Sequence, residues 1–204
     1  MADYYRSQYA AGNIIFGISG SFDESEVKEY LNGNLPSHLE PFPKIVPTPA
    51  KESQSEPRLK IADKKTDQTH LCLGFKSYSL THPRRFPLLI LNAILGGGAS
   101  SRLFQNIRET LGLAYAVGSS ADFLTDTGET VIQAGLNSEK LNLALTEILK
   151  ELTAIKDAAV TIGELTLAKE MLKGHFLLGL EDSHSVLDFF VHQEILTNKI
   201  ITPE

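Results

Sequence analysis

Histidine is the residue type in this chain best suited to bind a metal or carry a proton, and six are present. His184, Asp188 and His192 follow one another at intervals of four residues, so they would form one stripe along a helix. The outer two would lie about 12 Å apart, whereas a metal–nitrogen bond is about 2 Å long. One ion cannot join all three side chains. We therefore expect a solvated or hydrogen-bonded face, with a two-ligand adventitious site as the alternative.

A glycine run, Gly96-Gly97-Gly98, precedes two serines and raises the possibility of a phosphate-binding loop. A Walker loop needs Gly-Lys followed by Ser or Thr, because the lysine must reach the phosphates. Here the first basic residue, Arg102, comes too late. The run instead predicts a helix break, where glycines allow positive φ or a close backbone approach.

Three more side chains with reactive groups have ordinary structural interpretations. Arg108 falls in the last turn of a predicted helix, where its charge favours the helix dipole, and Tyr115 falls half-buried in a predicted strand. Cys72 is the only cysteine, which excludes an intrachain disulfide and a thiolate metal cluster. Because it lies between Leu71 and Leu73, we expect a buried, inert thiol.

The first elements that could position these side chains are a strand and a helix. The apolar, β-branched run at residues 13–19 predicts a strand buried on both faces. Asp23 and Glu26 form a capping-box pattern for a helix that continues to about Leu31. Residues 36–57 contain six prolines and no sustained periodicity, which predicts an extended linker.

A strand and two helices are predicted next. Residues 70–78 indicate the strand, and leucines at helical spacing indicate a helix that stops at the glycine run. Ser100 or Ser101 can cap the second helix, which Gly112 ends. The apolar face of this second helix comprises Leu103, Phe104, Ile107 and Leu111.

Two strands and a helix follow. Residues 113–123 and 129–136 predict an antiparallel pair, joined by a turn of sequence TDTG. A helix begins at Ser138, and its apolar stripe from Leu141 to Ile155 is expected to pack on the sheet rather than fill a partner's groove.

The last predicted elements are helical. Thr161 and Glu164 form a second capping box for a helix that extends to about Glu181, and residues 183–196 predict another. The order of all elements predicts an α+β fold, in which helices lie on one face of a largely antiparallel sheet. The strand at residues 13–19 has no partner of its own, so it must join that sheet or another chain.

Size and charge limit the classes of function. A chain of 204 residues can hold one domain, or one domain and part of another. Its net charge of -6 argues against a nucleic-acid partner, and no apolar run approaches the ~18 residues of a membrane span, so we expect a soluble protein.

The two ends suggest a piece of a longer protein. The N-terminus has no secretory signal, and the cytoplasm is favoured, although a targeting signal could lie upstream. At the other end Thr202 and Pro203 form a helix-start pattern just before the sequence stops.

The segment from Leu95 to Tyr115, LGGGASSRLFQNIRETLGLAY, resembles the second-domain signature of the pitrilysin/insulinase zinc peptidases and the related mitochondrial processing peptidase subunits. Residues 4–23 resemble the strand and helix that close the preceding, zinc-bearing domain of such proteins. The resemblance implies a metallopeptidase half-shell with residues 1–35 in the zinc-bearing domain, 36–60 as a linker and 61–204 as a C-terminally truncated second domain.

In this family an arginine and a tyrosine at the spacing of Arg108 and Tyr115 reach across a chamber to the substrate beside the zinc. The resemblance therefore implies that these two side chains contact the substrate and the oxyanion of amide hydrolysis. It also implies a weaker contact between substrate backbone and the glycine loop, which comprises Gly96, Gly97, Gly98 and Ser101.

The family's zinc motif, His-x-x-Glu-His, is missing from this sequence, and His192-Gln193-Glu194 is the nearest approach. The chain is thus predicted to carry no metal and to be inactive alone, with zinc on another domain or subunit of the same family. Its partners would be that subunit and a peptide substrate, with no nucleic acid and no membrane. The alternatives are a non-catalytic structural or peptide-binding subunit, like core subunits of the respiratory bc1 complex, and a domain without binding activity.

Overall fold

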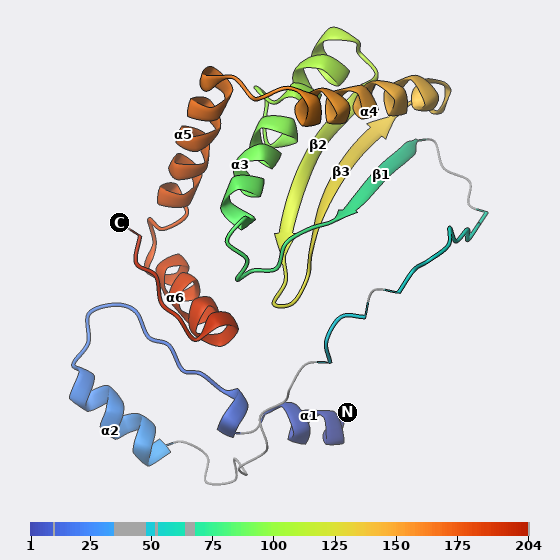
Figure 1. Ribbon diagram of the computed structural model, residues 1–204. Helices are drawn as coiled ribbons and strands as arrows, with labels where there is room; N and C mark the ends of the chain where they lie inside the picture. Colours follow the sequence, from blue (N-terminus) through green and yellow to red (C-terminus); the bar gives the residue numbers. More distant parts are fainter. Residues whose placement is uncertain (10, 35–47, 52, 64–67, 204) are drawn as a thin grey trace. The chain divides into compact units, whose positions relative to one another are not determined.

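The computed structural model describes residues 1–9, 11–34, 48–51, 53–63 and 68–203, which belong to two compact units (Figure 1). Unit 1 consists of Met1–Pro49 and Leu177–Glu204, and unit 2 consists of Ala50–Phe176. Most of the predicted linker, residues 36–47 and 52, lies outside the described residues. The described remainder of that linker contains no helix or strand.

Unit 2 is built on an antiparallel sheet of three strands in the order β1-β3-β2. Its strands are β1 (Thr69–Lys76), β2 (Ala114–Phe123) and β3 (Gly128–Leu136), within two residues of the predicted ends. The hairpin between β2 and β3 is closed by a hydrogen bond from the Leu124 amide to the Thr127 carbonyl at 3.0 Å. The predicted α+β class is confirmed.

Helices cover one face of this sheet. They are α3 (Arg85–Gly96), the π-helix η2 (Phe104–Thr110) and α4 (Leu141–Asp157), which the 3-10 turn η3 (Ser138–Lys140) precedes. Helix α5 (Ile162–Leu178) packs beside α3 through Ala168, which contacts Ala93 and Ile94. Leu103, Ile107, Ile132 and Ile148 are fully buried between η2, β3 and α4. The stripe on α4 therefore packs on the chain's own sheet, as predicted.

The end of α3 lies against β2 without any side chain between them. A Cβ built on Gly96 would lie 2.5 Å from the Ser119 nitrogen and 2.9 Å from the Gly118 carbonyl carbon. Only glycine fits such an approach. Of the two explanations predicted for the glycine run, close approach is correct, because positive φ among the described glycines occurs at Gly20 and Gly112 and not at residues 96–98.

The second predicted helix differs in type from expectation. Residues 104–110 form a π-helix, in which the Leu111 amide donates to the Asn106 carbonyl at 3.0 Å. The wider turn rotates Leu111 off the buried face, so it is 41% exposed and the predicted apolar face is wrong at that position. The predicted serine cap is also wrong, because no side chain caps this helix.

Cys72 is exposed, which contradicts the predicted buried thiol. Strand residues alternate between the two faces of a sheet. Leu71 and Leu73 pack against the core, so Cys72 faces the opposite side. The two leucines beside Cys72 therefore did not show whether β1 is buried on both faces or exposed to solvent on one.

Unit 1 contains α1 (Ala2–Gln8), η1 (Ala11–Asn13), α2 (Glu24–Asn34) and α6 (Ser183–Thr197). The Asp23 side chain caps α2 as predicted, since its Oδ1 accepts from the amides of Ser25 and Glu26. The strand predicted at residues 13–19 is wrong, because Asn13 ends η1 and residues 14–19 form neither a helix nor a paired strand within the described part of the chain.

The run at residues 13–19 packs on α6 instead. A Cβ built on Gly17 would lie 2.6 Å from Val191 Cγ2 and 2.7 Å from Leu187 Cδ1, so the helix occupies the space that a side chain would take. Ile15, Phe16 and Ile18 are each about half exposed. The apolar pattern thus indicates a segment suited to burial, but a strand also needs another strand with which its backbone can pair.

Among the described residues, no helix combines the length and apolar character that a membrane crossing requires.

We expect Gly96→Ala to lower the free energy of unfolding by about 1–3 kcal/mol, because the methyl group would meet the backbone of β2. Gly174→Ala is the matched control, since no atom lies within 4 Å of a Cβ built there and the site is inside α5. This control should raise stability by about 0.5–1 kcal/mol. Urea unfolding followed by circular dichroism measures both. Equal effects would contradict the proposed contact.

Candidate functional site

Unit 2 contains a cavity of about 670 Å³ beside β2. It is lined by Tyr115–Ser120 of β2, by Gly96 at the end of α3 and the following Gly97, and by His70–Cys72 of β1. Residues from the facing part of β3 complete it. Many of its lining residues are Gly, Ala or Ser, and such small side chains let an extended chain approach closely.

Tyr115 projects from an irregularity in β2. Ala114 pairs with Leu136 and Ala116 with Gly135, so Tyr115 is an extra residue without an opposite partner on β3. Such a β-bulge redirects the side chain of the extra residue. Tyr115 is accordingly 83% exposed, rather than half-buried as its strand position alone indicates, and it lines the cavity.

Only part of the glycine loop lines the same cavity as Tyr115. Gly96 and Gly97 line the cavity, whereas Gly98 and Ser101 are not among its lining residues. A Cβ on Gly98 would contact the Met171 sulfur at 3.3 Å, and Ser101 is only 3% exposed. The Oγ of Ser101 is buried and has no hydrogen-bond partner among the described residues.

Arg108 lies on η2 and is not among the residues that line the cavity. Its guanidinium carbon lies 4.7 Å above the Phe104 ring centroid, and its Nε lies 3.6 Å from Glu109 Oε1. The side chain is 43% exposed, so solvent weakens this ion pair. Both members of the Arg108–Tyr115 pair thus stand on irregular elements, a π-helix and a bulge, which occur often at functional sites.

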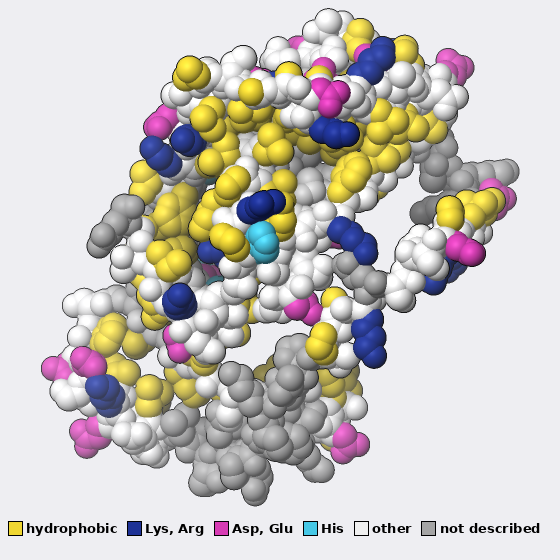
Figure 2. Space-filling view, viewed as in Figure 1, with side chains coloured by type: hydrophobic (Ala, Val, Ile, Leu, Met, Phe, Trp, Pro, Cys, Tyr) yellow, Lys and Arg dark blue, Asp and Glu magenta, His cyan; other side chains and the backbone are white. Residues whose placement is uncertain are grey.

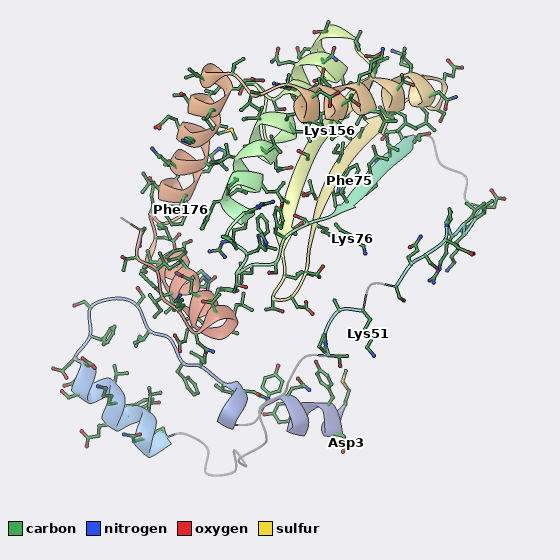
Figure 3. The ribbon with its side chains drawn as sticks, in the orientation of Figure 1. Asp3, Lys51, Phe75, Lys76, Lys156 and Phe176 are labelled. Atoms are coloured by element: carbon green, nitrogen blue, oxygen red, sulfur yellow. The ribbon has the colours of Figure 1, made fainter. Side chains whose placement is uncertain are left out.

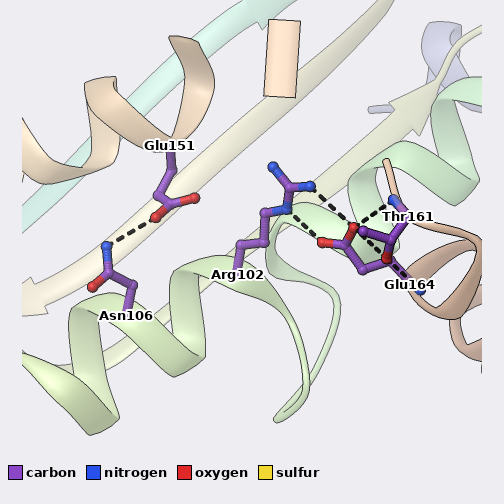
Figure 4. Close-up of polar contacts among 5 residues, drawn as sticks. All are labelled: Arg102, Asn106, Glu151, Thr161 and Glu164. Atoms are coloured by element: carbon purple, nitrogen blue, oxygen red, sulfur yellow. Dashed lines mark hydrogen bonds and ion pairs between the residues drawn. The ribbon is translucent and has the colours of Figure 1, made fainter. Parts of the chain in front are cut away.

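A polar network anchors the start of η2 to two helices (Figure 4). Arg102 binds Glu164 at the start of α5 through two hydrogen bonds, Nε to Oε1 at 2.6 Å and Nη2 to Oε2 at 3.1 Å. One turn later the Asn106 side chain donates to Glu151 Oε1 on α4 at 2.9 Å. These contacts fix the π-helix that carries Arg108.

Glu164 has a second role as half of the predicted capping box, which is confirmed. Its Oε2 accepts from the Thr161 amide at 2.8 Å, and its own amide donates to the Thr161 hydroxyl at 3.2 Å. The Arg102 hydrogen bond and the Thr161 amide lower the pKa of Glu164 to about 2. The capping pattern identified Glu164, but Arg102 lies 62 residues away and no local pattern could have paired them.

The described residues offer no group of three or more His, Cys, Asp or Glu side chains that could hold a metal ion. In the predicted stripe, His184 Nε2 lies 3.6 Å from Asp188 Oδ2, and His192 Nδ1 is 2.8 Å from the Asp188 carbonyl oxygen. The stripe is therefore a hydrogen-bonded, exposed face. A tetrahedral zinc site needs at least three protein ligands, so these residues do not fit one.

Residues 1–172 match the family model described as the peptidase M16 inactive domain. A Bacillus subtilis protein named as an uncharacterized zinc protease is 32% identical over 200 residues, which cover 98% of this chain and 48% of that protein. A Mycobacterium leprae protein with the same description is 31% identical over 89% of this chain and 41% of its own length. The chain thus spans about half the length of these curated relatives.

A solved structure confirms the likeness of fold. The crystal structure of a peptidase M16 inactive domain from Pseudomonas fluorescens aligns with a TM-score of 0.77 at 22% identity. The alignment covers 97% of this chain and 47% of that one.

We expect Glu164→Gln to lower the free energy of unfolding by about 1–2 kcal/mol at pH 7, allowing for partial solvent screening of the side chain. Because the folded pKa is about 2 and the ordinary value is 4.5, the carboxylate stabilises the fold above pH 4.5. That contribution is lost as the pH falls towards 2, so the two proteins should converge in acid. Urea unfolding at pH 7, 4 and 3 measures the difference.

Glu170→Gln is the matched control, since Glu170 pairs with Lys173 on the same helix but is 65% exposed. It should change stability by less than about 0.5 kcal/mol at any of these pH values. A pH-independent deficit in Glu164→Gln would show that packing, and not the ion pair, stabilises this region.

We expect the purified chain to contain no stoichiometric zinc and to hydrolyse no peptide, because its histidine stripe cannot supply three converging ligands. Elemental analysis after gel filtration and a peptide cleavage assay measure the two properties. One zinc per chain that disappears in His184→Ala would contradict this account of the stripe.

Proposed function

The chain belongs to the peptidase M16 inactive-domain family, and from this premise we propose that it forms one wall of the substrate chamber of a zinc-dependent peptidase. The observation that carries the proposal is the cavity beside β2, into which a bulge directs Tyr115 next to Gly96 and Gly97. The wall would position a peptide rather than activate water.

Tyr115 supplies the chemistry of this wall. Cleavage of an amide places negative charge on the carbonyl oxygen, and a phenol is a neutral donor that can stabilise that charge. For this role the phenol hydroxyl must be accessible to the substrate and not buried within the protein. Its 83% exposure and its position on the bulge agree with that requirement.

Arg108 would hold the substrate from the neighbouring π-helix. A guanidinium offers several donors in a fixed plane, which suits a peptide carbonyl or a carboxylate. Its contacts with the Phe104 ring and the half-exposed Glu109 are weak enough to be exchanged for a ligand. In the proposed role it approaches the peptide beyond the rim of the cavity that Tyr115 lines.

The glycine loop would let the peptide backbone come close. Gly97 is exposed at the cavity wall, and neither it nor the buried Gly96 beside it carries a side chain that would keep a ligand away. A peptide in extended form can exchange hydrogen bonds with such groups. Gly98 and Ser101 would support the loop from behind rather than contact the substrate.

The zinc that peptide hydrolysis requires would come from another domain or subunit of the same family. None of the described residues provides a fitting site, so this chain would contribute substrate positioning and charge stabilisation only. The partner would bring the metal to the open side of the cavity.

Residues 1–35 would belong to that zinc-bearing domain. The run before α2 is apolar and half exposed at Ile15, Phe16 and Ile18. The rest of the preceding domain would cover these apolar side chains.

In the intact parent protein we expect Tyr115→Phe to lower kcat/KM for a peptide substrate by about 10²-fold, because one donor to the developing oxyanion is removed. The change should fall mainly on kcat, since the ring that contacts the substrate is kept. Steady-state kinetics measures it, and an unchanged melting temperature shows that folding is intact.

Tyr30→Phe on α2 is the matched control, as it removes the hydroxyl of another exposed tyrosine, 67% exposed. Its kinetics should equal those of the unaltered protein. If Tyr115→Phe also left kcat/KM unchanged, the proposed role of Tyr115 would be wrong.

A further inference from the structure

A second cavity in unit 2, of about 400 Å³, shares no lining residue with the cavity of Tyr115. It lies among the end of β1, the helix α3, strand β3 and the second half of α4. Figure 2 shows apolar side chains gathered below α4 beside β1, and Figure 3 labels Phe75 at the end of β1. The apolar part of the lining comprises Phe75, Leu88, Leu91, Leu95, Leu152 and Ile155.

Three polar atoms at this cavity are buried without a hydrogen-bond partner among the described residues. They are Asn92 Oδ1, Ser77 Oγ and Thr130 Oγ1. All three residues line the cavity, and a fourth such atom, on Ser101, belongs to a residue that does not line it. An unpaired buried polar group costs about 1–3 kcal/mol, so three at one place mark a position where a bound molecule that hydrogen-bonds to them would be stabilised.

The orientation of the Asn92 side chain decides what it can bind. Its Nδ2 donates to the backbone carbonyl of Ser119 at 3.2 Å, while the Ser119 hydroxyl donates to the backbone carbonyl of Asn92 at 3.2 Å. Rotating the amide by 180° would break the first bond. Oδ1 is therefore fixed as an acceptor in a residue that is only 8% exposed. The missing partner must be a donor.

From these observations we propose that this cavity binds a small amphipathic molecule, with an apolar chain against the leucines of α3 and a neutral, donor-bearing head group at Asn92, Ser77 and Thr130. The two hydroxyls can each donate or accept, so they complement a head group with both functions, such as a primary amide or an alcohol. Few convergent polar groups in an apolar hollow are typical of small-molecule sites.

The chemistry disfavours other ligands. An anionic head could pair with Lys76, which also lines the cavity, but it would bring its charge next to Asn92 Oδ1, which can only accept hydrogen bonds. A cation would find no carboxylate among the lining residues. The volume accommodates about ten non-hydrogen atoms, if each occupies about 30 Å³ and some water remains. Octanamide has the right size and head group to serve as a probe.

The test is an NMR titration of the whole chain with octanamide and with methyl octanoate, which has a similar chain but no donor. We expect saturable shifts of amide resonances at residues 75–78, 88–95 and 130. Octanamide should bind about tenfold more tightly than the ester, the effect of one hydrogen bond to a buried acceptor.

Three variants of lining residues and one control outside the cavity separate the contributions to binding. Thr130→Val keeps the shape and should weaken octanamide binding about threefold, whereas Thr153→Val on the exposed side of α4 should not change it. Leu91→Trp fills the space and should abolish binding. Asn92→Leu should remove the preference for octanamide over the ester, and Thr130→Val provides the test of the head group if Asn92→Leu does not fold.

Three results would overturn the proposal. The first is the absence of saturable shifts at these residues with either probe. The second is equal affinity for octanamide and the ester, which would indicate an apolar gap without a polar end. The third is a shift pattern centred on Tyr115 and Gly96, which would place the ligand in the other cavity. None of these results bears on kcat/KM of Tyr115→Phe, so the proposed function is tested separately.

Discussion

The contact between Gly96 and the backbone of β2 is the constraint on which the rest of unit 2 depends. Because no Cβ separates them, the end of α3 can bind β2 through the reciprocal hydrogen bonds of Asn92 and Ser119. The same contact brings Gly96 and Gly97 to the rim of the Tyr115 cavity and turns Asn92 towards the second cavity. A side chain at position 96 would clash with the backbone of β2 at Gly118 and Ser119. One glycine thus determines the shape of two candidate binding sites.

The segment between Arg108 and Tyr115 holds two departures from regular structure and a left-handed glycine. The π-helix inserts one residue before Gly112, which has φ +57, and the bulge inserts another at Tyr115. Such irregularities cost free energy and persist only where the surroundings determine them. Here Leu103 and Ile107 are fully buried on one side of the π-helix, and Arg102 and Asn106 are bound to Glu164 and Glu151 on the other. The core therefore stabilises an arrangement that local sequence preferences would not produce.

Local patterns in the sequence predicted the regular elements, and they failed where tertiary partners decide the outcome. The strands of the sheet, the helices α3 to α6 and the capping box of Glu164 all follow from periodicity, turn residues and side-chain reach. The run at residues 13–19 shows the limit, because its composition suits a strand but it pairs with neither edge strand, β1 or β2, of the described sheet. The π-helix was missed for a related reason, since periodicity at residues 103–111 does not show where one extra residue enters. In the candidate site, the alternation of residues 70–73 carried a usable signal that Cys72 and His70 share the open face, whereas the pairing of Arg102 with Glu164 had none.

Under the proposed function, the high exposure of Tyr115 also explains why the chain alone would be inactive. A donor that is 83% exposed acts in a medium close to water, where hydrogen bonds to the solvent compete and a developing charge is already screened. The same donor contributes several kcal/mol only when a second surface covers the site and lowers the local dielectric constant. The wall therefore needs the zinc-bearing half for two separate reasons, to supply the metal and to exclude water from the phenol. A chain that spans about half the length of its relatives can provide the fixed geometry of the site, but the strength of its electrostatic interactions depends on the half that covers it.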